Sequence, residues 1–162
     1  LPTGPVYVGI APGSGGLPKC WPVENFVAVA KAQAAKGRAP VFILGPKEAD
    51  WKADLGAAVP EARFPLQDTG VETGHKYSPM FTIALARQLT VALSNDSGAG
   101  HMLAVGGAPL VSLFGTTVAE KFMPMTRRLV IVRAADFGGR EMAAIPVEPV
   151  LDAVEKALAM KR

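Results

Sequence analysis

Residues 90–101 read Thr-Val-Ala-Leu-Ser-Asn-Asp-Ser-Gly-Ala-Gly-His, a short apolar run followed directly by small and polar residues. Residues 90–93 have the composition of a buried strand, and Asn95, Asp96 and Ser97 are all favoured at helix starts. The stretch therefore predicts a strand, a tight turn and a helix whose first backbone N–H groups face an anion. A capped strand-to-helix turn without any ligand fits the same residues equally well.

The alternation of strand and helix runs through the whole chain. Six apolar runs rich in β-forming residues predict strands at residues 6–10, 41–44, 62–66, 90–93, 109–113 and 129–132. Helical spacing of apolar residues predicts helices at 23–36, 47–57, 79–88, 101–105 and 147–160. Strands that are apolar on both faces and separated by helices predict an α/β fold, a Rossmann-like doubly wound parallel sheet of about six strands.

Size and composition indicate one domain spanning residues 1–162, with 49% hydrophobic and 19% charged residues. The net charge of +3 comes from scattered Lys and Arg without a basic stripe, so we expect no nucleic-acid partner. Cys20 is the only cysteine and there are two histidines, so we expect neither a disulfide nor a metal site. The absence of a membrane-spanning run or an export signal predicts a cytoplasmic location.

The loops that follow strands are where a doubly wound sheet binds its ligand. The first of them, residues 11–22, is rich in glycine and contains Ser14, Gly15 and Lys19. Its small residues let backbone N–H groups approach a phosphate, with a hydroxyl and a cation beside them. It matches neither the Walker pattern nor the dinucleotide-binding pattern. The alternative interpretation is a flexible turn with Trp21 packed against the sheet.

The loops after the second and fourth predicted strands add further candidates. Glu48 follows the second strand, where a carboxylate can accept hydrogen bonds from the vicinal hydroxyls of a sugar. Taken alone, its residues favour a plainer role in the first turn of a helix. Asp96 is expected to orient a ligand or balance a cation, while Ser97 and the amides from Gly98 onward cradle a phosphate. His101 lies about one turn into the helix, with a half-buried packing role as its alternative.

Four motifs in this order, each after a predicted strand, resemble glycosyltransferase family 9, the heptosyltransferase family of lipopolysaccharide core synthesis. They are Pro12-Gly13-Ser14-Gly15-Gly16 with Lys19-x-Trp21-Pro22, then Leu44-Gly45-Pro46-x-Glu48, Ser94-Asn95-Asp96-Ser97-Gly98-x-x-His101 and Leu113-Phe114-Gly115-x-Thr117. The resemblance covers nearly the whole chain, because Ile145-Pro146-Val147-Glu148-x-Val150 is similar to the last helix of these enzymes.

The resemblance implies a GT-B fold, in which two Rossmann-like domains face each other across a cleft. The chain is similar to the C-terminal, donor-binding half, with the N-terminal acceptor domain absent. It implies inverting transfer of heptose from ADP-heptose, without metal or other cofactor, to a lipid-linked saccharide acceptor. Ser14 and Lys19 would bind the donor phosphates, Lys19 offsetting charge on the leaving diphosphate. Glu48 would hold the ribose hydroxyls, and the pocket for the diphosphate and the sugar would be lined by Asp96, Ser97, Gly98 and His101.

The family's catalytic base is an acidic residue of the N-terminal domain, so we expect this chain to bind donor without turning it over. A lipid-linked acceptor implies peripheral contact with the inner membrane, aided by Arg127 and Arg128. Three residues depart from the family motifs. Ser97 stands where Thr is usual, Ala99 where Pro or Leu is usual, and Thr116 where Pro is usual. Another nucleotide-sugar donor therefore stays an alternative, as does a non-catalytic module that binds a nucleotide or phosphate.

Overall fold

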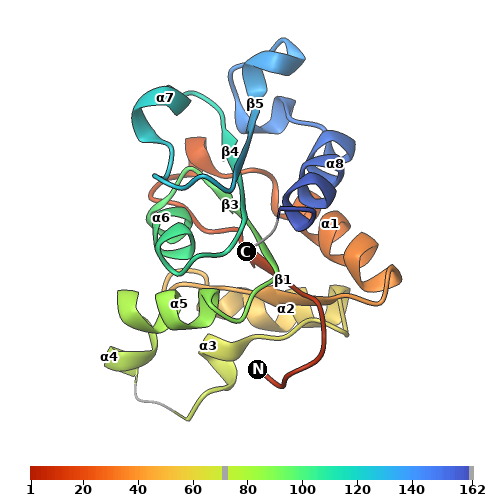
Figure 1. The fold of residues 1–162 in the computed structure, drawn as a ribbon, viewed down its shortest axis with the longest axis vertical. Coiled ribbons are helices and arrows are strands. Elements are labelled where there is room, and N and C mark those ends of the chain that lie inside the picture. The colour runs from red at the N-terminus through yellow and green to blue at the C-terminus, as the bar shows by residue number, and fades with distance from the viewer. Residues whose placement is uncertain (71–72, 161–162) are drawn as a thin grey trace.

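The computed structural model describes residues 1–70 and 73–160, which form a five-stranded sheet with helices on both faces (Figure 1). Every neighbouring pair of strands is parallel, in the order β2-β1-β3-β4-β5. The doubly wound, Rossmann-like α/β fold predicted from the sequence is therefore confirmed. The strands are β1 (Tyr7–Ala11), β2 (Ala39–Phe42), β3 (Val91–Asn95), β4 (Leu110–Phe114) and β5 (Leu129–Arg133).

The four longest helices are divided between the two faces of the sheet. α1 (Val23–Ala35) and α8 (Val147–Leu158) pack on one face, whereas α5 (Pro79–Ala86) and α6 (Gly98–Val105) pack on the other (Figure 1). The shorter helices are α2 (Lys52–Ala58), α3 (Pro65–Asp68), α4 (Thr73–Lys76) and α7 (Ala119–Phe122). Single 3₁₀ turns are η1 (Leu17–Lys19), η2 (Ala49–Trp51), η3 (Ala134–Phe137) and η4 (Met142–Ala144).

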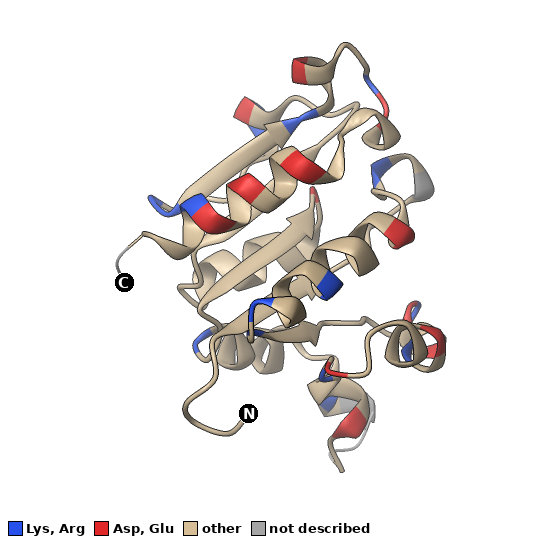
Figure 2. Ribbon diagram, turned by 90° about the vertical axis from the view of Figure 1, so that its right-hand side faces the viewer, with Lys and Arg blue, Asp and Glu red and all other residues tan. Residues whose placement is uncertain are grey.

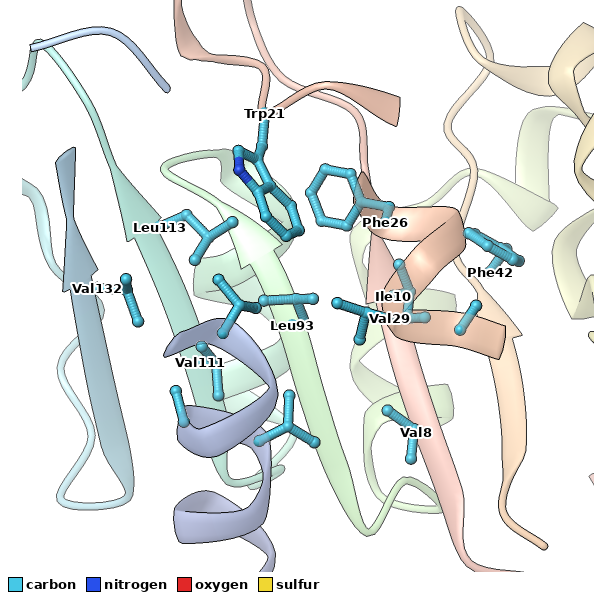
Figure 3. Close-up of a cluster of buried hydrophobic side chains, with 14 of the residues drawn as sticks. Val8, Ile10, Trp21, Phe26, Val29, Phe42, Leu93, Val111, Leu113 and Val132 are labelled. Atoms are coloured by element: carbon cyan, nitrogen blue, oxygen red, sulfur yellow. The ribbon is translucent and has the colours of Figure 1, made fainter. Parts of the chain in front are cut away.

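Strand side chains alternate between two hydrophobic cores. In β3, Val91 and Leu93 enter the core under α1 and α8, whereas Ala92 enters the core under α5 and α6. Trp21 lies at one end of the first core, above the strands and beside Phe26 (Figure 3). Only 1% of Trp21 is exposed, and its ring meets Phe26 edge to face with 5.0 Å between ring centroids. The predicted packing of Trp21 against the sheet is confirmed.

Of the six predicted strands, the third, at residues 62–66, was wrong. Only Arg63 makes an isolated bridge, to Val41 of the edge strand β2, and α3 begins at Pro65. Proline has no N–H for a ladder but suits the first turn of a helix, so Pro65 ends the extended segment. The helix predicted at residues 101–105 was right but begins three residues earlier, at Gly98.

Charged residues are spread over the outside of the domain. Figure 2 shows Lys and Arg scattered over several elements, with no single basic stripe on the described part of the chain. Of the two arginines considered for membrane contact, Arg128 donates to the carbonyl oxygen of Gly107 at 2.7 Å, whereas Arg127 is exposed. None of the described helices is long and apolar enough to cross a bilayer.

An ion-pair cluster links the two helices of one face, far along the chain from each other. Arg38, just beyond α1, donates to both carboxylate oxygens of Glu155 on α8, at 2.6 and 2.9 Å. Lys36 donates to the same carboxylate at 2.7 Å. The hydrogen bonds from Arg38 and then from Lys36 lower the pKa of Glu155 to about 2. The carboxylate is charged in the folded protein at pH values where an unpaired glutamate is protonated.

This lowered pKa predicts an acid-dependent loss of stability. The contribution of Glu155 is complete above its unfolded pKa of about 4.5 and is lost as the pH falls toward about 2. Because 38% of the side chain is exposed, solvent screening limits the contribution to about 1 kcal/mol. Urea unfolding of Glu155→Gln should show that loss at pH 7 and almost none at pH 2. Glu61→Gln, an exposed glutamate in a turn, is the control, and an equal loss at both pH values for Glu155→Gln contradicts the prediction.

Candidate functional site

The strand order places a crevice between β1 and β3. From β1 the chain moves outward to β2, and the other strands continue from β3 in the opposite direction. The loops that leave these two neighbouring strands therefore diverge at their carboxyl ends, which is where open α/β sheets bind ligands. The glycine-rich loop of residues 12–22 follows β1, and the start of α6 follows β3.

Two adjoining pockets lie at this crevice. The Glu48 pocket, of about 270 Å³, is bordered by the loops after β1 and β2, with Glu48 in its wall. The Asp96 pocket, of about 510 Å³, is bordered by the loop after β1 and the segment after β4, with Asp96 in its wall. Both pockets contain Gly15, Ser97 and Gly98, so the start of α6 forms a shared wall between them.

The structure brings all eight site residues named from the sequence to these two pockets. Ser14 and Glu48 line the first pocket, while the second is lined by Lys19, Asp96 and His101. The shared wall consists of Gly15, Ser97 and Gly98. Their positions agree with a common site, and their individual roles stay predictions.

A compact polar cluster is centred on the Asp96 carboxylate. Its Oδ2 atom lies 3.1 Å from Nζ of Lys19 and accepts a hydrogen bond of 2.7 Å from Oγ1 of Thr117. The Asp96 side chain is 8% exposed, whereas that of Lys19 is 39% exposed. Asp96 thus balances a cation, one of the two roles expected for it, and the ammonium of Lys19 is still accessible from the pocket.

The buried carboxamide of Asn95 holds the glycine-rich loop at both of its ends. Oδ1 accepts a hydrogen bond of 3.0 Å from the backbone N–H of Trp21, and Nδ2 donates at 2.7 Å to the carbonyl oxygen of Pro12. The indole N–H of Trp21 also donates to the carbonyl oxygen of Ile145 at 2.9 Å. One side chain at the end of β3 therefore fixes the position of a loop that follows β1.

The first turn of α6 is close to the sheet and has no side-chain cap. Ser97 occupies the cap position, but its hydroxyl makes no hydrogen bond to the helix. A Cβ atom on Gly100 would lie 2.7 Å from Oγ of Ser94, so glycine allows α6 to approach β3. Since the first backbone N–H groups of a helix need partners, an uncapped start that borders both pockets is suited to bind an anion.

Glu48 turns across the crevice toward the glycine-rich loop. A Cβ atom on Gly13 would lie 2.7 Å from the carboxyl carbon of Glu48, and one on Gly45 would lie 2.9 Å from Oε2. Glycine at both positions therefore leaves room for the carboxylate. The plainer alternative placed Glu48 in the first turn of a helix, but the residue stands just before the helical turn η2, makes no side-chain cap hydrogen bond and lies in the pocket wall.

Two further residues near the pockets are His101, for which the sequence left two interpretations, and Cys20, the chain's one cysteine. His101 is exposed at the fourth position of α6, so the alternative of a half-buried packing histidine was wrong. Burial raises the pKa of the Cys20 thiol, the neighbouring Ser14 hydroxyl opposes this, and the Glu48 carboxylate raises it further. The thiol is therefore protonated at neutral pH and is a poor nucleophile.

Sequence reasoning missed two contributors that come from the segment after β4. Thr117 was named only as the end of the last sequence motif, without a role, yet it donates to Asp96. Phe122 lines the Asp96 pocket, and Nζ of Lys19 lies 5.6 Å from the centroid of its ring. No local signal marked Phe122, because only the folded chain brings the short helix α7 beside the loop after β1.

The fold and the site together define a Rossmann-like α/β domain with a glycine-rich loop and an uncapped helix start at its switch point. The sequence model of glycosyltransferase family 9 (heptosyltransferase) matches residues 3–143. The chain therefore belongs to glycosyltransferase family 9, as its sequence motifs suggested.

Curated relatives carry heptosyltransferase names. The chain is 26% identical over 127 residues to lipooligosaccharide heptosyltransferase 2 of Haemophilus influenzae, a match that covers 78% of this chain and 36% of that protein. It is 27% identical over 166 residues to lipopolysaccharide heptosyltransferase 3 of Escherichia coli, covering 94% of this chain and 46% of that protein. The chain thus spans less than half the length of these two relatives.

Solved heptosyltransferases share the fold. The Escherichia coli heptosyltransferase WaaC with ADP superposes with a TM-score of 0.80 at 19% identity, covering 97% of this chain and 46% of that chain. The same enzyme with ADP-2-deoxy-2-fluoro heptose gives a TM-score of 0.75 at 18% identity, covering 96% and 45%. At this identity the likeness shows the fold.

The geometry around Asn95 predicts a large loss of stability on its removal. Asn95→Ala would leave the buried N–H of Trp21 and the carbonyl of Pro12 without partners, at a cost of about 2 to 4 kcal/mol. Chemical unfolding monitored by tryptophan fluorescence measures this loss. Asn25→Ala on α1 is the matched control, expected to change stability by less than about 1 kcal/mol. Equal stability of the two variants would contradict the conclusion that the Asn95 side chain holds the glycine-rich loop.

Proposed function

We propose that this chain is the donor-binding domain of a glycosyltransferase that transfers heptose from ADP-heptose to a lipopolysaccharide core acceptor. The observation that carries the proposal is the convergence of Ser14, Lys19, Glu48 and Asp96 on two pockets joined by the start of α6. Family membership and the heptosyltransferase names of the curated relatives support the choice of sugar and acceptor. WaaC solved with ADP supports the choice of nucleotide.

The shared wall suits the diphosphate. The uncapped first turn of α6 supplies backbone N–H groups there, and Gly15 of the glycine-rich loop belongs to the same wall. Ser14 and Ser97 add hydroxyls on the two sides. Backbone amides at a helix start bind phosphate through both hydrogen bonds and the helix dipole.

Glu48 suits the ribose of the donor. Its carboxylate lies in the wall of the smaller pocket, beside the shared wall, at the carboxyl end of β2. A carboxylate at this place in a Rossmann-like sheet accepts hydrogen bonds from ribose hydroxyls. This assignment puts the nucleoside in the Glu48 pocket and leaves the Asp96 pocket for the transferred sugar.

Lys19 would act on the leaving group. In an inverting transfer the acceptor hydroxyl attacks the anomeric carbon from the face opposite the diphosphate, and the bond from that carbon to the phosphate oxygen breaks. The electron pair leaves with ADP, so negative charge grows on the diphosphate. On this proposal the Lys19 ammonium and the α6 amides stabilise this charge, and no metal ion or other cofactor is required.

We assign the acceptor and its base to a part of the enzyme beyond this chain. The chain matches 36% and 46% of the two curated relatives, which supports its role as one part of a longer enzyme, and its motifs resemble those of the C-terminal half. On this proposal the chain binds donor and does not transfer sugar by itself. A lipid-linked acceptor implies work at the cytoplasmic face of the inner membrane, with Arg127 exposed for anionic headgroups.

Calorimetric titration with ADP, ADP-heptose and UDP-sugars tests the proposal through Lys19. Lys19→Ala should weaken ADP binding by at least about tenfold, since it removes a charged phosphate contact and leaves Asp96 unpaired beside the site. The control is Lys121→Ala, which removes another ammonium close to Phe122 but none from either pocket wall. Tighter binding of a UDP-sugar than of ADP-heptose would identify the UDP-sugar as the donor. Binding of phosphate without nucleotide preference would favour a non-catalytic module. No nucleotide binding at all would reject the proposal.

The assignment of Glu48 makes a separate prediction. Glu48→Gln keeps the size of the side chain but weakens its hydrogen bonds to ribose hydroxyls, so ADP affinity should fall about tenfold. Inorganic pyrophosphate has no ribose, and its affinity should change by less than about twofold. Glu141→Gln, a carboxylate outside both pockets, is the control. A parallel loss of pyrophosphate binding would place Glu48 near the phosphates instead.

A further inference from the structure

The Asp96 pocket contains an aromatic ring that the motifs do not include. Phe122 is the last residue of α7 and lines this pocket together with Asp96, His101 and Thr116. The residue is 42% exposed, even though Nζ of Lys19 and Nζ of Lys121 lie 5.6 and 5.5 Å from its ring centroid. A large apolar ring that stays this exposed beside a polar pocket is available to a ligand.

The order of the two pockets assigns the ligand part that reaches Phe122. If the diphosphate lies at the shared wall and the nucleoside lies beside Glu48, the sugar must extend to the other side of α6. That side is the Asp96 pocket. This step rests on the proposed function, because it takes the position of the nucleoside from Glu48.

The chemistry of the pocket matches that of a sugar. A pyranose ring has polar hydroxyls around its edge and a face made largely of C–H groups. Asp96, His101 and Thr116 supply polar atoms, and Phe122 supplies the apolar surface. An aromatic ring also carries negative charge on its face, which attracts the C–H groups of a sugar polarised by neighbouring oxygens.

We infer that Phe122 is a specificity residue of the donor site, contacting the sugar of the nucleotide sugar and not its nucleotide. The exposed ring is covered by the C–H face of the sugar on binding. Discrimination between donors with the same nucleotide then depends on how well each sugar fits this ring and the polar groups opposite. A planar aromatic side chain at position 122 is sufficient for the contact, whereas a branched aliphatic one is not.

The test compares ADP with ADP-heptose by calorimetry on the whole chain. Phe122→Leu should weaken ADP-heptose binding by about five- to tenfold and change ADP binding by less than about twofold. Phe122→Trp should retain the extra affinity that the sugar provides. Phe137→Leu replaces another partly exposed phenylalanine, 37% exposed and outside both pockets, and should change neither affinity.

Three results would overturn the inference, and each has a different meaning. An equal loss of ADP and ADP-heptose binding in Phe122→Leu means that the ring acts through Lys19 on the phosphates. Unchanged affinity for both ligands means that the ring does not contact the donor. Failure of the unaltered chain to bind either ligand rejects the proposed function itself. Circular dichroism and thermal unfolding establish that each variant is folded.

Discussion

The site depends on two hydrogen bonds that the side-chain carboxamide of Asn95 makes to the glycine-rich loop. The loop after β1 and the start of α6 belong to segments far apart in the chain, and Asn95 bonds to the first loop at Pro12 and at Trp21. Trp21 is itself anchored by a buried ring and by its indole N–H. Because the loop between these anchors is rich in glycine, few side chains hold its backbone in place. Their backbone can face a ligand because both ends of the loop are fixed.

The electrostatic arrangement follows from this geometry. With the loop in place, Lys19 reaches Asp96 on the strand-to-helix turn after β3, and Thr117 from the segment after β4 donates to the same oxygen. The carboxylate is almost buried, so its charge needs these partners, whereas the ammonium remains partly exposed. An entering phosphate therefore meets a positive group that is already held in position and backbone amides that have no side-chain cap.

The sequence was sufficient for the sheet and for bringing the eight candidate site residues to one edge of it, because both depend on local patterns. Apolar runs marked all five strands, and residues after strands converge at one edge of a parallel sheet whatever the details of packing. The prediction of a strand at residues 62–66 was wrong because the run has the composition of a strand, but Pro65 begins a helix. Asn95 looked like a helix cap, but its partners Pro12 and Trp21 come from another loop. Phe122 gave no local signal, since tertiary contacts alone bring it to the pocket.

The parallel pairing of β1 with β3 also has a consequence for folding. Lys19 and Asp96 are 77 residues apart in sequence, and the two strands that present their loops pair across all of the intervening chain. Closing so long a loop costs entropy before any contact is gained, which slows folding. A ligand that touches both loops binds only the completed sheet, and its binding free energy is added to global stability. Amide hydrogen exchange in β1 and β3 would then slow with ligand concentration, even at positions the ligand never touches.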